Sequence, residues 1–161
     1  MISIRRYFAQ AKSEVVDPYG FIDDVYRYAL ARTGSKEDAE DIAIEVVQHT
    51  PKRMLAAELR PYMIGMARRK VADFHRRADR PTMVDAGVFL PAFDQSIDVH
   101  RALERLTDNH REALILKYVN GFSSAEIGSV MSLTSEAVDS LLQRARKSFV
   151  SEWNDMHGEE E

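Results

Sequence analysis

The chain has 161 residues, of which 45% are hydrophobic and 30% are charged, so it is long enough for one ordinary domain or two small ones and has the composition of a globular protein. It contains no cysteine, which excludes disulfides, thiolate zinc sites and a cysteine nucleophile and fits a reducing, cytoplasmic compartment. The formal net charge of −4 argues against a protein that binds nucleic acid unaided, and no apolar run approaches the roughly 20 residues of a membrane span.

Helical patterning dominates the N-terminal half. The first 17 residues lack the apolar core and cleavage site of a secretory signal. Apolar residues then recur at helical spacing up to Gly34, and Ser35 opens a start signal close to a capping box. The following helix should end before Pro51, and Pro61 suits the first turn of a third helix.

Basic residues gather in one stretch of this acidic chain. Residues 67–80 read ARRKVADFHRRADR, which places six Arg and Lys residues against two Asp residues. Acidic residues are concentrated elsewhere, at 37–41 and 159–161. Such a local basic stretch indicates a protein that contacts DNA with the help of a larger partner.

The helical pattern breaks between residues 78 and 96, where Pro81, Gly87 and Pro91 interrupt the chain. We therefore predict an all-α fold of two small helical domains, 1–77 and 97–161, joined by a linker at 78–96. No segment predicts a strand. Domains of this size have thin cores, so we expect a mobile pair whose relative placement is fixed by a partner.

A helix-turn-helix pattern follows near the C-terminus. Ser123 and Glu126 form a capping box, and Gly128 is small where two helices must cross closely. Ser132 occupies the turn position that usually favours a glycine for its positive φ, and Thr134 can cap the second helix. A helical hairpin within a core is the alternative, but the combined signals favour DNA binding by the second helix.

The second helix presents a polar face. Ser140 and Gln143 could read base edges, whereas Arg144 and Lys147 would hold phosphates. Its acidic residues could accept a hydrogen bond from cytosine, or could simply place favourable charge near the helix N-terminus. The predicted DNA-contacting residues are Ser135, Glu136, Asp139, Ser140, Gln143, Arg144 and Lys147.

Residues 106–149 resemble the C-terminal, promoter-reading domain of extracytoplasmic-function sigma factors. They carry the Arg-Glu pair at 111–112 and the Arg-Ala-Arg-Lys run at 144–147. In the N-terminal half, DAEDIAIEVV at 38–47 looks like the polymerase-binding helix of that family, and YMIGMARRKVADFHRR at 62–77 looks like its promoter-melting helix. Two matching blocks in the family order are more specific than either block alone.

The resemblance implies a sigma factor that binds core RNA polymerase and directs promoter-specific transcription initiation, without enzyme activity or a cofactor. It also implies promoter DNA and an anti-sigma factor as partners, no membrane insertion, and a free chain that is monomeric. The loop at 50–60 and the helix after it would engage the minus-ten element, and the last helix would read the minus-thirty-five element. The implied polymerase contacts are Asp38, Glu40, Asp41 and Glu45, and the implied minus-ten contacts are Arg68, Arg69, Lys70, Arg76 and Arg77.

Three other functions remain open at this point. A sigma-like decoy that sequesters an anti-sigma factor is favoured by Glu136 and Asp139 but disfavoured by the basic stretch, which a decoy does not need. A one-component helix-turn-helix regulator leaves the N-terminal match unexplained. An enzyme lacks support because the five histidines are scattered, without a pair at i, i+4 or an H-E-x-x-H motif.

Overall fold

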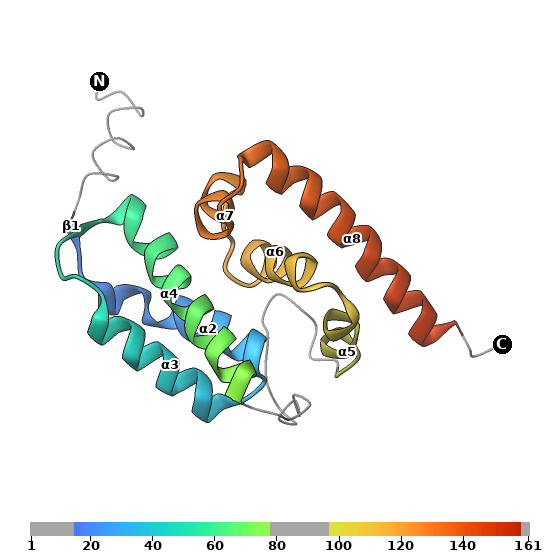
Figure 1. The fold of residues 1–161 in the computed structure, drawn as a ribbon, viewed down its shortest axis with the longest axis horizontal. Coiled ribbons are helices and arrows are strands. Elements are labelled where there is room, and N and C mark those ends of the chain that lie inside the picture. Colours follow the sequence, from blue (N-terminus) through green and yellow to red (C-terminus); the bar gives the residue numbers. More distant parts are fainter. Residues whose placement is uncertain (1–14, 78–96, 159–161) are drawn as a thin grey trace, which may run out of the picture.

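A computed structural model describes residues 15–77 and 97–158 of the chain (Figure 1). Within these ranges the fold is helical apart from two very short strands, which confirms the predicted all-α class. The predicted linker at 78–96 lies outside the described residues. The N-terminal half contains η1 (Pro18–Phe21), α2 (Ile22–Thr33), α3 (Lys36–His49) and α4 (Ala56–Arg77), and the C-terminal half contains α5 (Ile97–Arg105), α6 (Asp108–Tyr118), α7 (Ser124–Met131) and α8 (Ser135–His157).

The two strands were not expected from the sequence. Strand β1 (Val15–Val16) pairs antiparallel with β2 (Met54–Leu55), with Val15 opposite Leu55 and Val16 opposite Met54. A segment of two residues is too short to display the alternating pattern that identifies a strand in a sequence. The pair joins the chain before α2 to the chain before α4.

Local signals set the helix ends in the N-terminal half. Gly34 adopts a left-handed conformation with φ 68° and ends α2, while the hydroxyl of Ser35 accepts a hydrogen bond from the Asp38 backbone N–H over 3.3 Å and caps α3. The prediction for Pro61 was wrong, because α4 already begins at Ala56 and Pro61 lies inside the helix. Pro61 has no backbone N–H, so it cannot donate a hydrogen bond to the carbonyl of Ala57 one turn earlier. The loss lowers helix stability little, because Ala57 is exposed to solvent.

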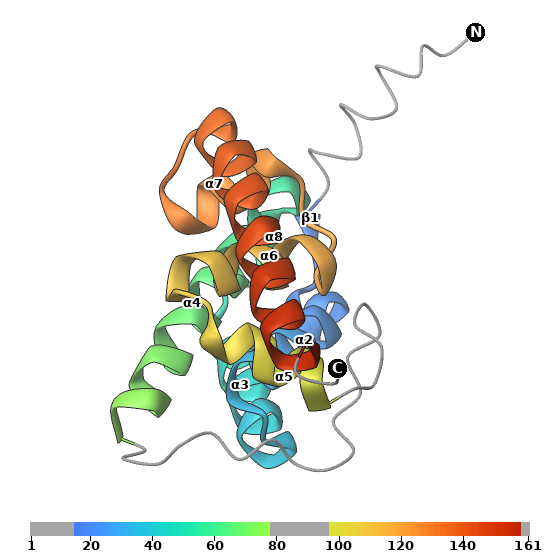
Figure 2. The same cartoon turned by 90° about the vertical axis from the view of Figure 1, so that its right-hand side faces the viewer.

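Each half has its own layer of apolar side chains. In the N-terminal half α2, α3 and α4 pack together around residues such as Tyr28 and Met63, both fully buried. In the C-terminal half α8 crosses the outside of α5, α6 and α7, around Ile115 and Ile127 (Figures 1 and 2). Buried residues of both halves belong to one continuous cluster.

The two halves contact each other directly. Helix α4 packs against α7, and α2 packs against α6. The expectation of two bodies placed only by a partner was therefore wrong for this structure, in which polar and apolar side chains of both halves meet in a buried interface. The predicted domain boundaries themselves stay a prediction.

Candidate nucleic-acid and polymerase interfaces

Helices α7 and α8 form a helix-turn-helix whose local geometry follows the sequence signals. The backbone N–H of Ser123 donates to Glu126 Oε2 over 2.8 Å, and the N–H of Glu126 donates to Ser123 Oγ over 3.2 Å, so the capping box is complete. Thr134 accepts a hydrogen bond from the N–H of Ala137 over 3.1 Å and caps α8. These contacts confirm the predicted start of both helices.

The turn between the helices is tight. Ser132 adopts the left-handed conformation at φ 58°, as its place in the motif predicted. The Leu133 N–H returns to the carbonyl of Gly128 over 2.9 Å. A Cβ added to Gly128 would lie 2.4 Å from the carbonyl oxygen of Leu133, so this position admits only glycine without a backbone shift. Val138 is fully buried in the resulting crossing and fixes α8 against α7.

The outer face of α8 is open to solvent over its first turns. Of the seven residues predicted to contact DNA on α8, Ser135 is half-buried and the other six are exposed. Asp139 accepts a hydrogen bond from the hydroxyl of Ser124, so it ties α8 to the start of α7. The Nε of Arg144 donates to the carbonyl of Ser140 over 3.4 Å and keeps that guanidinium along the helix.

Helix α3 presents an acidic face with an apolar centre. Glu40, Asp41 and Glu45 are exposed, whereas Asp38 is half-buried near the helix start. Ile44 lies on the same helical face and is 49% exposed. A hydrogen bond from the Lys70 ammonium to Glu45 over 2.5 Å lowers the pKa of that carboxyl. Helix α3 therefore exposes three carboxylates and one apolar side chain on the same face.

The basic residues of α4 do not form one continuous stripe. Arg69 and Arg77 are exposed, and Arg76 is also exposed but pairs with Asp73. Arg68 instead points into the interface between the halves, where its Nη1 donates to the Val130 carbonyl over 3.2 Å. Of the five residues predicted to contact the minus-ten element, Arg68 therefore lies apart from the others in this structure.

An open groove of about 620 Å³ lies where η1 meets the end of α3. Tyr19 is 60% exposed at this groove, and Gln48 and Lys52 bring polar side chains to it. Sequence reasoning missed Tyr19, because an isolated aromatic residue in a short 3-10 helix carries no periodic signal. The complete lining is Val16, Asp17, Pro18, Tyr19, Val47, Gln48, Thr50 and Lys52.

A buried polar cluster joins α2 to α6. The Tyr28 hydroxyl donates to Glu112 Oε1 over 2.7 Å, and Arg32 Nε lies 3.3 Å from Glu112 Oε2. Arg32 Nη2 also donates to Asp108 over 2.7 Å. Burial, opposed by the charge of Arg32 and the hydrogen bond from Tyr28, raises the pKa of Glu112. Burial and the charge of Glu112 raise the pKa of Tyr28 well above its ordinary value.

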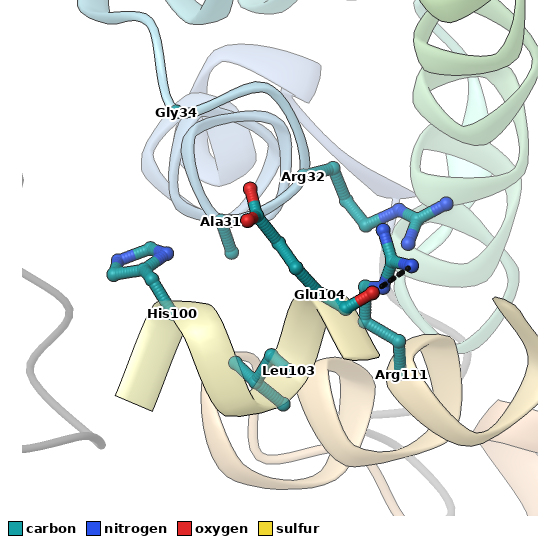
Figure 3. A pocket seen from close by; sticks show the side chains of 7 residues that line it. All are labelled: Ala31, Arg32, Gly34, His100, Leu103, Glu104 and Arg111. Carbon is teal, nitrogen blue, oxygen red and sulfur yellow. Dashed lines mark hydrogen bonds between the residues drawn. The ribbon is translucent and has the colours of Figure 1, made fainter. Parts of the chain in front are cut away.

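At the edge of this cluster lies a small pocket between α2 and the C-terminal half (Figure 3). Its volume is about 10 Å³, which is room for one water molecule. Figure 3 shows the guanidinium groups of Arg32 and Arg111 side by side, with the Arg111 group donating to the backbone carbonyl of Glu104. The sequence motif located Arg111 and Glu112 but did not indicate that they face α2.

Within 15–77 and 97–158 the structure contains no group of three or more His, Asp or Glu side chains able to hold a metal ion. None of the helices in these same ranges is both long enough and apolar enough to cross a membrane.

Comparisons with known proteins agree with this architecture. Residues 96–149 match the family model described as sigma-70, region 4. The chain is 24% identical over 148 residues to the ECF RNA polymerase sigma factor SigM of Bacillus subtilis, covering 83% of this chain and 91% of that protein. It is 33% identical over 143 residues to the ECF RNA polymerase sigma factor SigD of Mycobacterium tuberculosis, covering 75% of this chain and 68% of SigD.

A solved structure shares the fold across both halves. The sigma factor RpoE of Bartonella quintana, solved in complex with the anti-sigma factor NepR, aligns with a TM-score of 0.66 at 15% identity and covers 97% of this chain and 99% of its own. The identity to SigD over most of both chains shows the family. The chain belongs to the ECF RNA polymerase sigma factors of the sigma-70 family, which direct transcription initiation.

Proposed function

We propose that this sigma factor uses an N-terminal domain, 1–77, to bind core RNA polymerase and the minus-ten element, and a C-terminal domain, 97–161, to read the minus-thirty-five element. The observation that carries the proposal is the helix-turn-helix itself. Its crossing at Gly128 has no room for a side chain, and it leaves the first turns of α8 exposed. A helix presented in this way can enter the major groove.

Helix α8 would divide its contacts between bases and phosphates. Ser140 and Gln143 are exposed and can donate and accept hydrogen bonds at base edges. Arg144 and Lys147 lie one turn further along and would neutralise phosphates. Asp139 already accepts a hydrogen bond from Ser124, so we assign it to the stability of the motif before any contact with DNA.

The minus-ten element would lie along α4 and the groove beside η1. Tyr19 offers an exposed ring on which an unstacked base can stack, and Lys52 offers a cation for the adjoining phosphate. Arg69, Arg76 and Arg77 are exposed along α4 and can follow the backbone. Lys70 is bound to Glu45 and would contribute after that pair separates.

Core RNA polymerase would bind the acidic face of α3. Glu40, Asp41 and Glu45 supply charge that steers association, and Ile44 supplies an exposed apolar anchor among them. Asp38 is half-buried and would contribute at the edge of that contact. We further propose that the free chain is a cytoplasmic monomer and that an anti-sigma factor regulates it, because its structural relative RpoE was solved with such a partner.

The test is binding of the purified chain to core RNA polymerase, followed by promoter-selective run-off transcription. Ile44→Glu should abolish binding to core, whereas the matched change Val150→Glu, at an apolar residue of α8 that is 55% exposed, should leave it intact. Selective transcripts that depend on Ile44 support the proposal. A folded chain that binds an anti-sigma factor but not core polymerase would instead be a decoy.

A further inference from the structure

Glu136 lies in the first turn of α8, at the end of the helix that enters the major groove in the proposed function. Its side chain is exposed and forms no hydrogen bond or ion pair with any other described residue. Ser140 and Gln143, one and two turns further along the same helical face, are exposed as well. The carboxylate of Glu136 therefore begins a row of polar side chains, at the end of a recognition helix that meets the base edges.

Helix capping does not account for Glu136, as a comparison of α7 with α8 shows. In α7 the N-cap is Ser123, and Glu126, three residues later, accepts a hydrogen bond from the Ser123 backbone N–H over 2.8 Å. In α8 the N-cap is Thr134, and the residue three positions later is Ala137. Glu136 lies one position too early for the reciprocal bond, so the cap of α8 does not use its carboxylate.

Asp139, the other acidic residue on the predicted reading face of α8, already has a partner. It accepts a hydrogen bond from the hydroxyl of Ser124 and so connects α8 to the start of α7. This bond occupies one oxygen of Asp139, whereas both oxygens of Glu136 are open to an external donor. The two acidic residues therefore have different roles in the helix-turn-helix.

A carboxylate in the major groove selects among the four bases, because it can only accept hydrogen bonds. Guanine presents N7 and O6 and thymine presents O4, and these acceptor atoms repel a carboxylate. Adenine places its N6 donor beside the N7 acceptor, so the second carboxylate oxygen meets a lone pair. Cytosine presents its N4 amino group without an adjacent acceptor, and it is the base with which a glutamate pairs best.

Cations on the same helix reduce the electrostatic cost of bringing a carboxylate to DNA. Arg144 and Lys147 are exposed, two and three turns after Glu136. Their contacts with phosphates would supply affinity and hold the helix in register on the duplex. Repulsion between Glu136 and every base without a free donor then contributes specificity rather than affinity.

We propose that Glu136 is a base-selecting residue of this sigma factor, and that its carboxylate accepts a hydrogen bond from the N4 amino group of a cytosine in the minus-thirty-five element. A C·G pair at that one position is then preferred to the other three pairs. The inference rests on the proposed function, in which α8 reads this element, and it names the base chemistry of one contact within it.

The test is selection of promoter DNA by the complex of the full chain with core RNA polymerase. The minus-thirty-five region is randomised, and the bound DNA is sequenced for the parent protein and for each variant. We expect the parent to enrich cytosine at one position at least about fivefold over each other base. Glu136→Ala should abolish this preference at that position alone. Glu136→Gln should replace it with a preference for adenine, because glutamine pairs with N6 and N7 of adenine.

Glu152→Gln is the matched control on the same helix. It removes a carboxylate near the other end of α8, where Glu152 pairs with Arg105 over 3.7 Å, and it should leave every base preference unchanged. Because Glu136 is exposed and contacts no other described side chain through a polar bond, its variants should fold, and circular dichroism should show the helical content of the parent.

A cytosine preference that neither Glu136 variant alters would refute the assignment of Glu136, and so would preference for another base at the position that the variants do alter. Glu136 would then serve only the N-terminal dipole of α8, and Glu136→Gln would lower the free energy of unfolding without changing selectivity. A parent complex that selects no base anywhere in the minus-thirty-five region would refute the proposed reading by α8 together with this inference.

Discussion

Tyr28 in α2 and Glu112 in α6 are 84 positions apart in the chain and share a buried hydrogen bond of 2.7 Å. Both side chains are fully buried, and they come from different halves of the molecule. The contact fixes α2 against α6, and it orients the carboxylate towards Arg32 and Arg68. A buried carboxylate depends on such partners, because removing one of them leaves an unsatisfied charge.

Replacing Tyr28 with phenylalanine should therefore lower the free energy of unfolding. The hydroxyl donates to a buried carboxylate, and hydrogen bonds to charged groups contribute about 1.5–3 kcal/mol. Chemical denaturation of the full chain measures the change. Tyr62→Phe, at a partly exposed tyrosine of α4, is the matched control and should change stability by less than about 0.5 kcal/mol. Equal effects of the two variants would show that the Tyr28 bond contributes nothing specific.

The raised pKa of Glu112 should be detectable in the pH dependence of the free energy of unfolding. Burial raises its folded pKa above the ordinary glutamate value of about 4.3, so the folded state holds this proton more tightly than the unfolded chain. Its contribution to stability is present below that ordinary value and is lost as the pH rises through the folded pKa. Between the ordinary glutamate pKa and the folded pKa of Glu112, the unfolding free energy should fall less with rising pH in Glu112→Gln than in the parent protein. Parallel profiles for the two proteins would contradict the raised pKa.

Asp108 provides a control of opposite sign for that measurement. Burial alone would raise its pKa, but the hydrogen bond and charge of Arg32 outweigh burial and lower it. Its contribution to stability is present above the ordinary aspartate pKa of about 3.9 and is lost as the pH falls through the folded value. Asp108→Asn should therefore weaken the loss of stability on acidification. Because the charge of Asp108 helps to raise the Glu112 pKa, the same variant should also move the loss of stability that is due to Glu112 to lower pH.

The sequence predicted those features that depend on neighbouring residues. The capping box at Ser123 and Glu126, and the left-handed turn at Ser132, follow from local hydrogen bonding and backbone preference. The contact of Tyr28 with Glu112 has no local signal, because either residue alone could be an ordinary member of its helix. Its identification required the arrangement of α2 against α6 in space.

Gly128→Ala should destabilise the helix-turn-helix by about 1–3 kcal/mol, the range for inserting a group into a filled contact. The added Cβ would lie 2.4 Å from the Leu133 carbonyl oxygen, which is backbone and cannot rotate away. Gly65→Ala is the matched control, because that glycine lies inside α4 with no atom within 4 Å of the added Cβ. It should raise stability by about 0.5–1 kcal/mol through helix propensity. Thermal unfolding of both variants measures the difference, and the same sign for both would refute the steric argument.

Ser132→Gly should stabilise the protein by about 1 kcal/mol. Ser132 has a φ of 58°, a conformation that costs an L-residue roughly 1–2 kcal/mol and that glycine adopts freely. Ser151→Gly makes the same chemical change within α8, where glycine should instead cost about 0.5 kcal/mol relative to serine. Chemical denaturation distinguishes the two signs. Destabilisation by both changes would mean that the Ser132 side chain stabilises the turn by more free energy than the left-handed backbone conformation costs.

Arg144→Ala should weaken promoter binding by the complex with core polymerase to a similar extent for different minus-thirty-five sequences. Arg144 is exposed on α8, one turn beyond Ser140, which is proposed to read bases, and exposed arginines supply many of the phosphate contacts in protein–DNA complexes. Loss of one phosphate contact should reduce the slope of log affinity against log salt concentration by about 0.9. Arg101→Ala, at an exposed arginine of α5 paired with Asp98, should leave affinity and slope unchanged. A loss confined to one promoter sequence would instead make Arg144 a base-reading residue.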